Sequence, residues 1–347
     1  MSDRARWDLR GPVRTLDLHR TWRYSKRSAE SNACELTESG DHSIVEFNPD
    51  GAISRHWHRN PDNSEITSTH AYDPAGRLVS VQSESSTSPA HLGLYEYDQH
   101  GRLARHLSRD ADGQEHTIET YSYDAEGRQT KTRFAPQPER NYGYAIEGSK
   151  AFYSAPNAAT ITTSYNYAGR PTELLFHDAT GALISRVDFL YDASGNLIEE
   201  TQTRAVSPFA NFEENLAPEQ LEALRALLSG PFTQRKHRHD ALGNRIETIS
   251  TMFGSVGKDR ETLEYNQYGD PIAQTSEHES LEYGFADEGG PLESHPGEHH
   301  RSEARFLYEY DTYGNWITKI TESRHADHSA FSLSSTEHRT LTYFDPI

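Results

Sequence analysis

The chain has 347 residues, an apolar content of only 34% and a formal net charge of −19 at pH 7. The acidic balance argues against nucleic acid as a partner, because phosphate binding relies on clusters of Lys and Arg. A single cysteine, Cys34, excludes a disulfide framework within the chain. No apolar run reaches the about 18 residues of a membrane-spanning helix, and no apolar signal-peptide core follows Met1. We therefore expect no membrane partner and a cytoplasmic protein, with export by a specialised system left open.

The first part of the chain, residues 1–44, lacks the repeated pattern that fills the rest and is predicted to be an N-terminal capping segment. Trp7 to Val13 indicates a turn that feeds a strand. Repeat arrays commonly carry an atypical segment over the exposed edge of their first repeat. A polar loop is expected from Ser28 to Asp41, and the repeat array itself over residues 45–347.

One short motif organises the remainder of the chain, and Tyr72-Asp73-Pro74-Ala75-Gly76-Arg77-Leu78 is its clearest copy. Asp73 suits the first position of a type I turn, where its carboxylate can accept a hydrogen bond from a backbone N–H two residues on. Gly76 suits the fourth position, because a residue with φ > 0 there starts a bulge in the return strand. A side chain in that left-handed region costs roughly 1–2 kcal/mol. The motif therefore predicts a hairpin corner.

Copies of this corner recur about 25 residues apart, and a fixed period of this length indicates a repeat architecture. Aromatic residues stand at alternate positions before the corners, as in Tyr95 to Tyr97 and Phe306 to Tyr310, which matches the period of a strand. The residues predicted to form the structural turns are Asp73, Gly76, Asp98, Gly101, Asp124, Gly127, Asp192, Gly195, Asp240, Gly243, Asp311 and Gly314.

A helical insertion is predicted at about residues 214–230. Pro218 stands in the first turn, an early Glu follows, and Gly230-Pro231 provides a stop. An apolar stripe of Leu221, Leu224 and Leu228 favours packing on the sheet, with partner binding as the alternative. Residues 287–303 are polar and are expected to form a mobile loop. The predicted fold is all-β: an antiparallel β-hairpin repeat array, curved or spiral, with closure into a barrel or shell as an alternative.

The repeated Tyr-Asp-x-x-Gly-Arg/Asn-Leu/Ile over roughly residues 45–345 resembles the YD repeats of the Rhs family and the related shells of teneurins. The resemblance implies a spiralling antiparallel sheet of hairpins whose strand-borne tyrosines stack toward the inside. In large family members such a sheet winds into a hollow cocoon that can enclose a toxin domain. The opening Trp-x-Leu-x-Gly-Pro-Val also looks like small stand-alone repeat proteins of this type.

The chain departs from the family pattern at several corners. His177 and His239 replace the Tyr, and Asn166 and Asn266 replace the Asp. The Asp-Pro-x-Gly self-cleavage core that ends many Rhs shells is missing, so self-proteolysis and toxin delivery are not inferred from the resemblance.

Histidines provide the candidate metal ligands. His56 and His58 share one strand face, a spacing that can bind Zn²⁺, and they are the weak candidates for a metal site. Two further groups are His237 with His239, and His295, Glu298, His299 and His300. Because spacing alone does not assemble three ligands in a pocket, hydrogen-bonded or solvated histidine is the simpler interpretation. Neither a metal nor another cofactor is predicted.

No catalytic residue is predicted. The turns account for most Asp residues, Cys34 has no local nucleophile motif, and neither a Gly-x-Ser-x-Gly nor a phosphate-binding Gly motif is present. A tyrosine-lined face could stack on sugar rings or grip a peptide. The candidate ligand-binding residues are Tyr97, Tyr123, Tyr191 and Tyr310.

The leading hypothesis is a non-enzymatic scaffold or binding protein that holds a protein or small-molecule partner on this tyrosine-lined face. The alternative is a carbohydrate-binding or carbohydrate-active protein with a glycan partner. A metal-dependent hydrolase that uses the histidine clusters is the third hypothesis.

Overall fold

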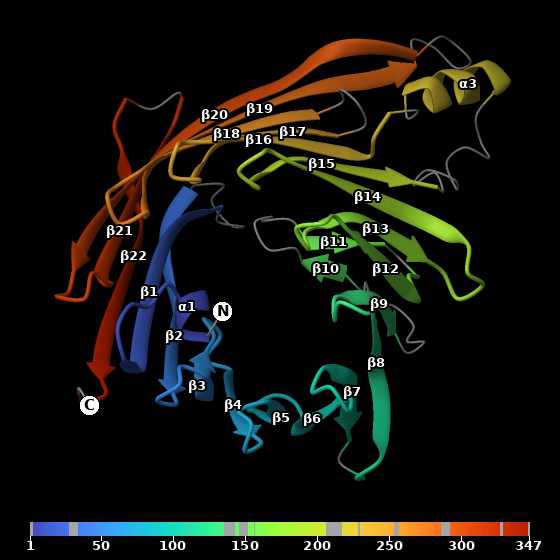
Figure 1. The fold of residues 1–347 in the computed structure, drawn as a ribbon. Helices are drawn as coiled ribbons and strands as arrows, with labels where there is room; N and C mark the ends of the chain where they lie inside the picture. Colours follow the sequence, from blue (N-terminus) through green and yellow to red (C-terminus); the bar gives the residue numbers. More distant parts are fainter. Residues whose placement is uncertain are drawn as a thin grey trace. The chain divides into compact units, whose positions relative to one another are not determined.

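The computed structural model describes most of the chain as antiparallel strands (Figure 1). Of the strands it defines, twenty belong to one sheet, and β10 and β11 form a separate pair. The prediction of an all-β antiparallel hairpin array with one inserted helix is confirmed. The described residues are 3–27, 34–110, 112–134, 143–145, 152–155, 157–205, 217–227, 230–252, 257–285, 292–326 and 329–345.

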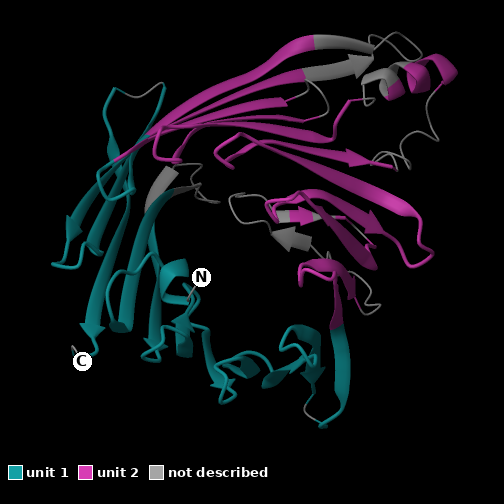
Figure 2. Ribbon diagram, viewed as in Figure 1, with its two compact units in different colours: residues 1–118, 266–273, 304–347 teal, residues 119–265, 274–303 magenta. Residues whose placement is uncertain are grey.

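Two compact units divide the chain (Figure 2). Unit 1 comprises residues 1–118, 266–273 and 304–347, and unit 2 comprises residues 119–265 and 274–303. The elements wholly in unit 1 are α1 (Asp3–Arg6), β1 (Val13–Arg27), β2 (Cys34–Phe47), β3 (Ile53–Arg59), β4 (Glu65–Tyr72), β5 (Leu78–Ser85), β6 (His91–Tyr97), β7 (Leu103–Arg109), β21 (Trp316–His325) and β22 (Ser332–Tyr343).

Unit 2 continues the series of hairpins. Its elements are β9 (Gln129–Phe134), β10 (Gly143–Ala145), β11 (Phe152–Ser154), β12 (Thr160–Tyr165), β13 (Pro171–His177), β14 (Leu183–Tyr191), β15 (Leu197–Arg204), α3 (Pro218–Leu227), β16 (Thr233–His239), β17 (Arg245–Met252) and β18 (Gly257–Tyr265). Strands with residues in both units are β8 (Glu115–Tyr123), β19 (Pro271–Phe285) and β20 (Leu292–Tyr310).

The N-terminal segment contributes whole strands to the sheet. Within unit 1, β1 pairs with β2 on one side and with the last strand, β22, on the other, so that Leu16 lies opposite both Val45 and Leu341. β2 begins at Cys34, and the loop predicted from Ser28 to Asp41 is therefore wrong over residues 34–41. Its polar residues continue the β1–β2 ladder, because an antiparallel strand that is wetted on one face keeps polar side chains. The capping boundary at residue 44 stays a prediction.

The mobile loop predicted at residues 287–303 is wrong from residue 292 onward, where β20 begins. The polar composition misled the prediction, because β20 is a long strand whose described side chains between residues 295 and 300 are mostly exposed. A strand with this much water contact shows no apolar alternation that could mark it in the sequence.

The corners are type I turns followed by a glycine bulge. Gly76 N–H donates to Asp73 O at 2.9 Å, and Asp73 N–H donates to Arg77 O at 2.9 Å. The Asp73 carboxylate accepts from the backbone N–H groups of Ala75 and Arg77. The glycines with positive φ are Gly11, Gly51, Gly76, Gly101, Gly113, Gly127, Gly169, Gly181, Gly195, Gly243, Gly269 and Gly314.

Substitution of the corner glycines tests this backbone requirement. At Gly127, with φ of 80° and open space around the added Cβ, Gly127→Ala should lower the unfolding free energy by roughly 1–2 kcal/mol through φ strain alone. Gly195→Val should cost more, on the order of 1–3 kcal/mol, because its side chain also displaces the Arg170 guanidinium. Urea denaturation measures both. Unchanged midpoints in both variants would contradict the turn assignment.

Each unit has its own apolar core. In unit 1, Leu16, Leu18 and Val45 are buried with Trp316. In unit 2, strands β12 to β14 supply Ile161, Leu174, Phe176 and Val187, all without exposed surface. These clusters are small for 347 residues, which agrees with the low apolar content of the chain.

The inserted helix α3 covers residues 218–227 of the predicted 214–230. Leu221 N–H donates to Ala217 O at 2.9 Å, and the Gln220 side chain turns back to accept from Ala217 N–H at 3.1 Å. This is half of a capping box, which fixes the helix start. Leu221 is half-buried, whereas Leu228 lies outside the described residues. Among the described residues, no helix combines the length and apolar character needed to cross a membrane.

Candidate functional site

The corner side chains hold one repeat to the next. The Arg77 guanidinium bonds Asp73 in its own corner and lies over the ring of Tyr97 in the next corner, 4.7 Å from its centroid. Tyr97 in turn donates its hydroxyl to Leu78 O at 2.7 Å. The motif residues Tyr, Asp and Arg therefore stabilise contacts between consecutive hairpins as well as the turns themselves.

The same arrangement recurs in unit 2. The Arg128 guanidinium binds Asp124 and lies over the Tyr165 ring, and Tyr165 donates to Gln129 O at 2.6 Å. In each pair of corners, the arginine stacks on the tyrosine of the next corner, and the partly buried tyrosine hydroxyl bonds back to the first. Removing either side chain therefore takes contacts from both corners.

The four tyrosines proposed as ligand-binding residues have structural surroundings. Besides its bond to Leu78, Tyr97 has a pKa that burial raises above its ordinary value. Tyr310 donates to Asp270 Oδ2 at 2.8 Å and accepts from Asn266 Nδ2 at 2.7 Å, and burial raises its pKa to about 12. These two tyrosines lie in unit 1.

The other two tyrosines lie in unit 2. Tyr191 packs against the core with Arg170 over its ring, its hydroxyl is buried without a hydrogen bond among the described residues, and burial raises its pKa. Tyr123 closes β8 and is half-buried. Ligand binding by these residues stays a prediction.

The turn aspartates make the fold sensitive to acid. The N–H of Arg102 is the main cause that lowers the pKa of Asp98 to about 2, from 3.8. The unfolded chain takes up this proton near pH 4, so the stabilising bond is complete above about pH 4 and is lost as the pH falls toward 2. Asp73, Asp124, Asp192 and Asp240 show the same direction of pKa shift.

We expect Asp98→Asn to lose less stability than the wild type between about pH 4 and pH 2, because an amide at this position does not titrate. Asn166 shows that an amide can make the same turn, since its Oδ1 accepts from the N–H groups of Ala168 and Arg170. Urea midpoints measured across this pH range provide the comparison. Identical slopes for the two proteins would contradict the prediction.

His56 and His58 share one face of β3, as predicted. The nitrogens of His58 bond protein groups, whereas His56 Nε2 is buried without a hydrogen bond among the described residues. His58 Nδ1 bonds Ser43 Oγ at 2.8 Å, and its Nε2 bonds Asn60 Oδ1 at 3.0 Å. The Trp7 ring meets His56 edge-on at 5.7 Å. Burial, with His58 next in importance, lowers the pKa of His56.

In each of the other two histidine groups, one histidine bonds a carboxylate. On β20, His300 bonds Glu298 at 2.9 Å, and both side chains are exposed. On β16, the side chain of His237 is only 1% exposed and its Nε2 lies 2.6 Å from Glu200 Oε1. His239 stands two residues further along β16, and burial lowers its pKa.

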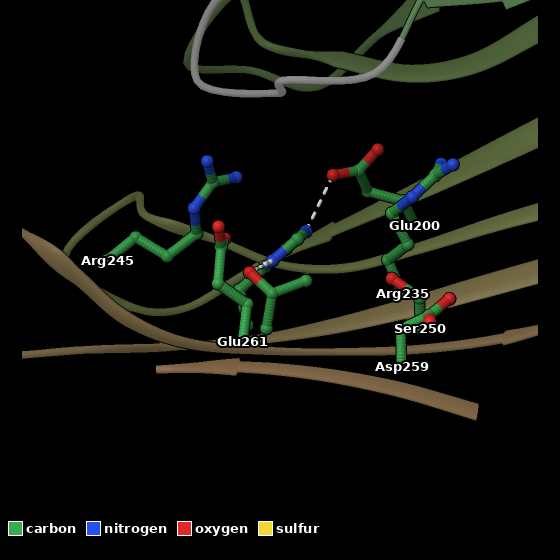
Figure 3. Close-up of a pocket in the computed structure, with 8 residues that line it drawn as sticks. Glu200, Arg235, Arg245, Ser250, Asp259 and Glu261 are labelled. Atoms are coloured by element: carbon green, nitrogen blue, oxygen red, sulfur yellow. Dashed lines mark hydrogen bonds and ion pairs between the residues drawn. The ribbon is translucent and has the colours of Figure 1, made fainter. Parts of the chain in front are cut away.

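A cavity of about 220 Å³, lined by polar and charged residues, lies over strands β15 to β18 in unit 2 (Figure 3). Its lining residues are Glu200, Arg235, His237, Arg245, Thr248, Ser250, Asp259 and Glu261. They come from four consecutive strands that pair in order, so the hairpin array itself brings them together. Glu200 and Arg235 are register partners on β15 and β16.

A buried chain of three polar groups borders this cavity. Glu200 Oε1 bonds His237 Nε2, and His237 Nδ1 lies 3.1 Å from Thr248 Oγ1. The imidazole can accept at one nitrogen while it donates at the other, so it links the carboxylate to the hydroxyl. Carboxylate, imidazole and hydroxyl follow one another in the same order in acyl-transfer enzymes. Here the carboxylate and the imidazole are each only 1% exposed, so neither is open to a substrate.

Sequence reasoning identified His237 but missed its partners. Glu200 stands 37 residues earlier, in a strand whose sequence is mostly polar. The buried residues of β15 are Leu197, Glu200 and Gln202. They do not follow a strict alternation, and a glutamate carries no hydrophobic signal, so the sequence did not mark Glu200 as buried.

Residues 43–209 match the Teneurin YD-shell family. Over 190 residues the chain is 26% identical to Teneurin-4 of Homo sapiens, covering 54% of this chain and 6% of that protein. Similar solved structures include TcdB2-TccC3-Cdc42, with 13% identity, a TM-score of 0.34 and coverage of 89% of this chain and 16% of that chain. A porin-like protein from Bacteroides uniformis shows 10% identity, a TM-score of 0.33 and coverage of 96% and 98%. The chain thus spans a small part of the length of Teneurin-4.

Proposed function

Because residues 43–209 match the Teneurin YD-shell family, we propose that this chain is a non-enzymatic scaffold whose linked corners hold a rigid surface for a partner. The observation that carries the proposal is the contact chain of Asp73, Arg77 and Tyr97, repeated at Asp124, Arg128 and Tyr165. The residues that recur along the chain are used in holding hairpins together. A scaffold role needs no further chemistry from them.

The corner contacts can be tested by hydrogen exchange. Arg128→Met removes both the Asp124 ion pair and the contact with the Tyr165 ring, and should raise amide exchange in β12 and β13. Arg105→Met is the matched control, because Arg105 pairs only with Glu96 among its described contacts and both side chains are about half exposed. Equal exchange in both variants would remove the rigid-scaffold argument, because the stacked arginines would then contribute nothing specific.

For the partner, we propose a small polyol such as a monosaccharide in the cavity over β15–β18, which is the carbohydrate-binding hypothesis in its non-hydrolytic form. The cavity offers guanidinium donors from Arg235 and Arg245, acceptor carboxylates and the Ser250 hydroxyl. The hydroxyl groups of a polyol both donate and accept hydrogen bonds, so they suit a lining that contains donors and acceptors. At about 220 Å³ the cavity is smaller than the about 300–1,000 Å³ of sites for drug-sized molecules.

Saturation-transfer NMR with a panel of monosaccharides tests this site on the full chain. Arg245→Met should abolish the transfer signal, because the Arg245 side chain lines the cavity and its Nε has no hydrogen bond among the described residues. Arg186→Met is the control, since Arg186 is an exposed arginine of unit 2 that pairs with Asp188 and Glu173. Absence of any signal with wild type, or full signal with Arg245→Met, would reject the polyol site and leave the scaffold proposal standing.

A further inference from the structure

We propose that Asp17, His19 and His42 form a binding site for a divalent transition-metal ion of the Zn²⁺ class. Asp17 and His19 are two residues apart on β1 and share one face of the strand. His42 on β2 is the register partner of His19. One ligand atom from each residue lies within 4.8 Å of the others. The site lies wholly within unit 1 and differs from both the cavity and the predicted pair of His56 and His58.

The orientation of the three groups favours coordination. His19 Nε2 lies 3.1 Å and His42 Nε2 lies 2.7 Å from the same oxygen, Asp17 Oδ1. The two imidazole rings are stacked, with centroids 3.7 Å apart and an angle of 22° between their planes. Both Nε2 atoms therefore face one point beside the carboxylate. A cation at that point can take the place of the N–H hydrogens through which the two imidazoles would bond Asp17.

The distances are close to those of a metal centre. Zn–N and Zn–O bonds of about 2.0–2.2 Å place tetrahedral ligand atoms about 3.3 Å apart. The two distances to Asp17 Oδ1, 3.1 and 2.7 Å, are shorter than this, and small rotations of the Asp17 and His19 side chains, which are 38% and 54% exposed, can make up the difference. Two imidazoles and one carboxylate are typical ligands of zinc and other first-row transition metals.

Solvent access leaves room for the rest of the coordination sphere. The His42 side chain is 15% exposed, Asp17 is 38% and His19 is 54%. The buried end is supported by the Trp57 ring, which meets the His42 ring edge-on at 4.9 Å. Three protein ligands with an open side leave a position for water. A bound ion would join β1 to β2 at the strand that also pairs with β22.

Zinc titration calorimetry on the full chain tests the proposal. We expect one site in the wild type, and at least tenfold weaker binding in both His19→Gln and Asp17→Asn. His116→Gln is the matched control, because His116 lies 3.1 Å from Asp110 Oδ2 in an exposed pair outside the three-residue group. This control should bind like the wild type. Zn²⁺ should also raise the melting midpoint of the wild type and of His116→Gln, but not that of His19→Gln.

A second measurement locates the ion. Co²⁺ bound at this site should quench the Trp57 fluorescence, and His19→Gln should remove that quenching. Heat no greater than the buffer blank for the wild type, or wild-type affinity in His19→Gln, would overturn the proposal. In those cases the three residues form only a hydrogen-bonded cluster, or the ion binds elsewhere on the chain.

Discussion

Asn315→Ala is expected to lower the unfolding free energy by about 2–4 kcal/mol, because it leaves the partly buried backbone N–H and C=O of Arg10 without their partners. Asn315 has no exposed surface. Its Oδ1 accepts from Arg10 N–H at 2.5 Å, and its Nδ2 donates to Arg10 O at 3.0 Å and to the Tyr343 hydroxyl at 3.0 Å. One side chain thus satisfies both backbone groups of Arg10 and connects the N-terminal turn to the last complete corner of unit 1.

The chain provides a matched control at the same position of another corner. Asn244 also follows the corner glycine, and its Nδ2 bonds the turn carboxylate Asp240 at 2.9 Å, but no distant backbone group is among its described contacts. Asn244→Ala should therefore cost only about 0.5–1.5 kcal/mol. Urea denaturation at neutral pH compares the two. If both variants lose the same stability, Asn315 stabilises only its own turn, and its bonds to Arg10 contribute nothing measurable to the unfolding free energy.

The hairpin corners could be predicted from sequence because they are local. Every contact that defines the Asp73 turn, from its carboxylate bonds to the positive φ of Gly76, lies within five consecutive residues. Turn chemistry of this kind needs no knowledge of the rest of the fold. The same reasoning located the helix, since Pro218 and the helix stop at Gly230 are also local signals.

Contacts between distant strands could not be predicted in this way. His42 stands 25 residues from Asp17, and Glu200 stands 37 residues from His237. Each pair meets only because of the strand register. A shift of one residue would move every side chain to the opposite face of the sheet and separate the pair. The polar first parts of β2 and β20, residues 34–41 and 292–303, were predicted as loops for a related reason, because solvent-exposed strands have no apolar alternation. Sequence therefore indicated the corners but not which polar residues the strands bring together.

The largest energetic coupling is expected between Glu200 and His237. Glu200→Leu should lower the unfolding free energy by about 3–5 kcal/mol, because it leaves the imidazole of His237 without its carboxylate partner at a position only 1% exposed. His237→Leu should cost a similar amount, since it leaves the Glu200 carboxylate buried without the imidazole. Thr248 would keep a hydroxyl with no ring nitrogen beside it in that second variant.

The double variant Glu200→Leu/His237→Leu separates pairing from burial. We expect it to lose several kcal/mol less than the sum of the single losses, because replacing both partners of a buried pair with apolar groups removes the unpaired charge. Glu298→Ala breaks the exposed pair with His300 and should lower the unfolding free energy by less than about 1 kcal/mol. It serves as the reference for a solvent-exposed ion pair. Chemical denaturation of the wild type, the two single variants and the double variant completes the cycle. Additive losses would mean that Glu200 and His237 are stabilised by separate surroundings, and the polar wall of the cavity would then not depend on their pairing.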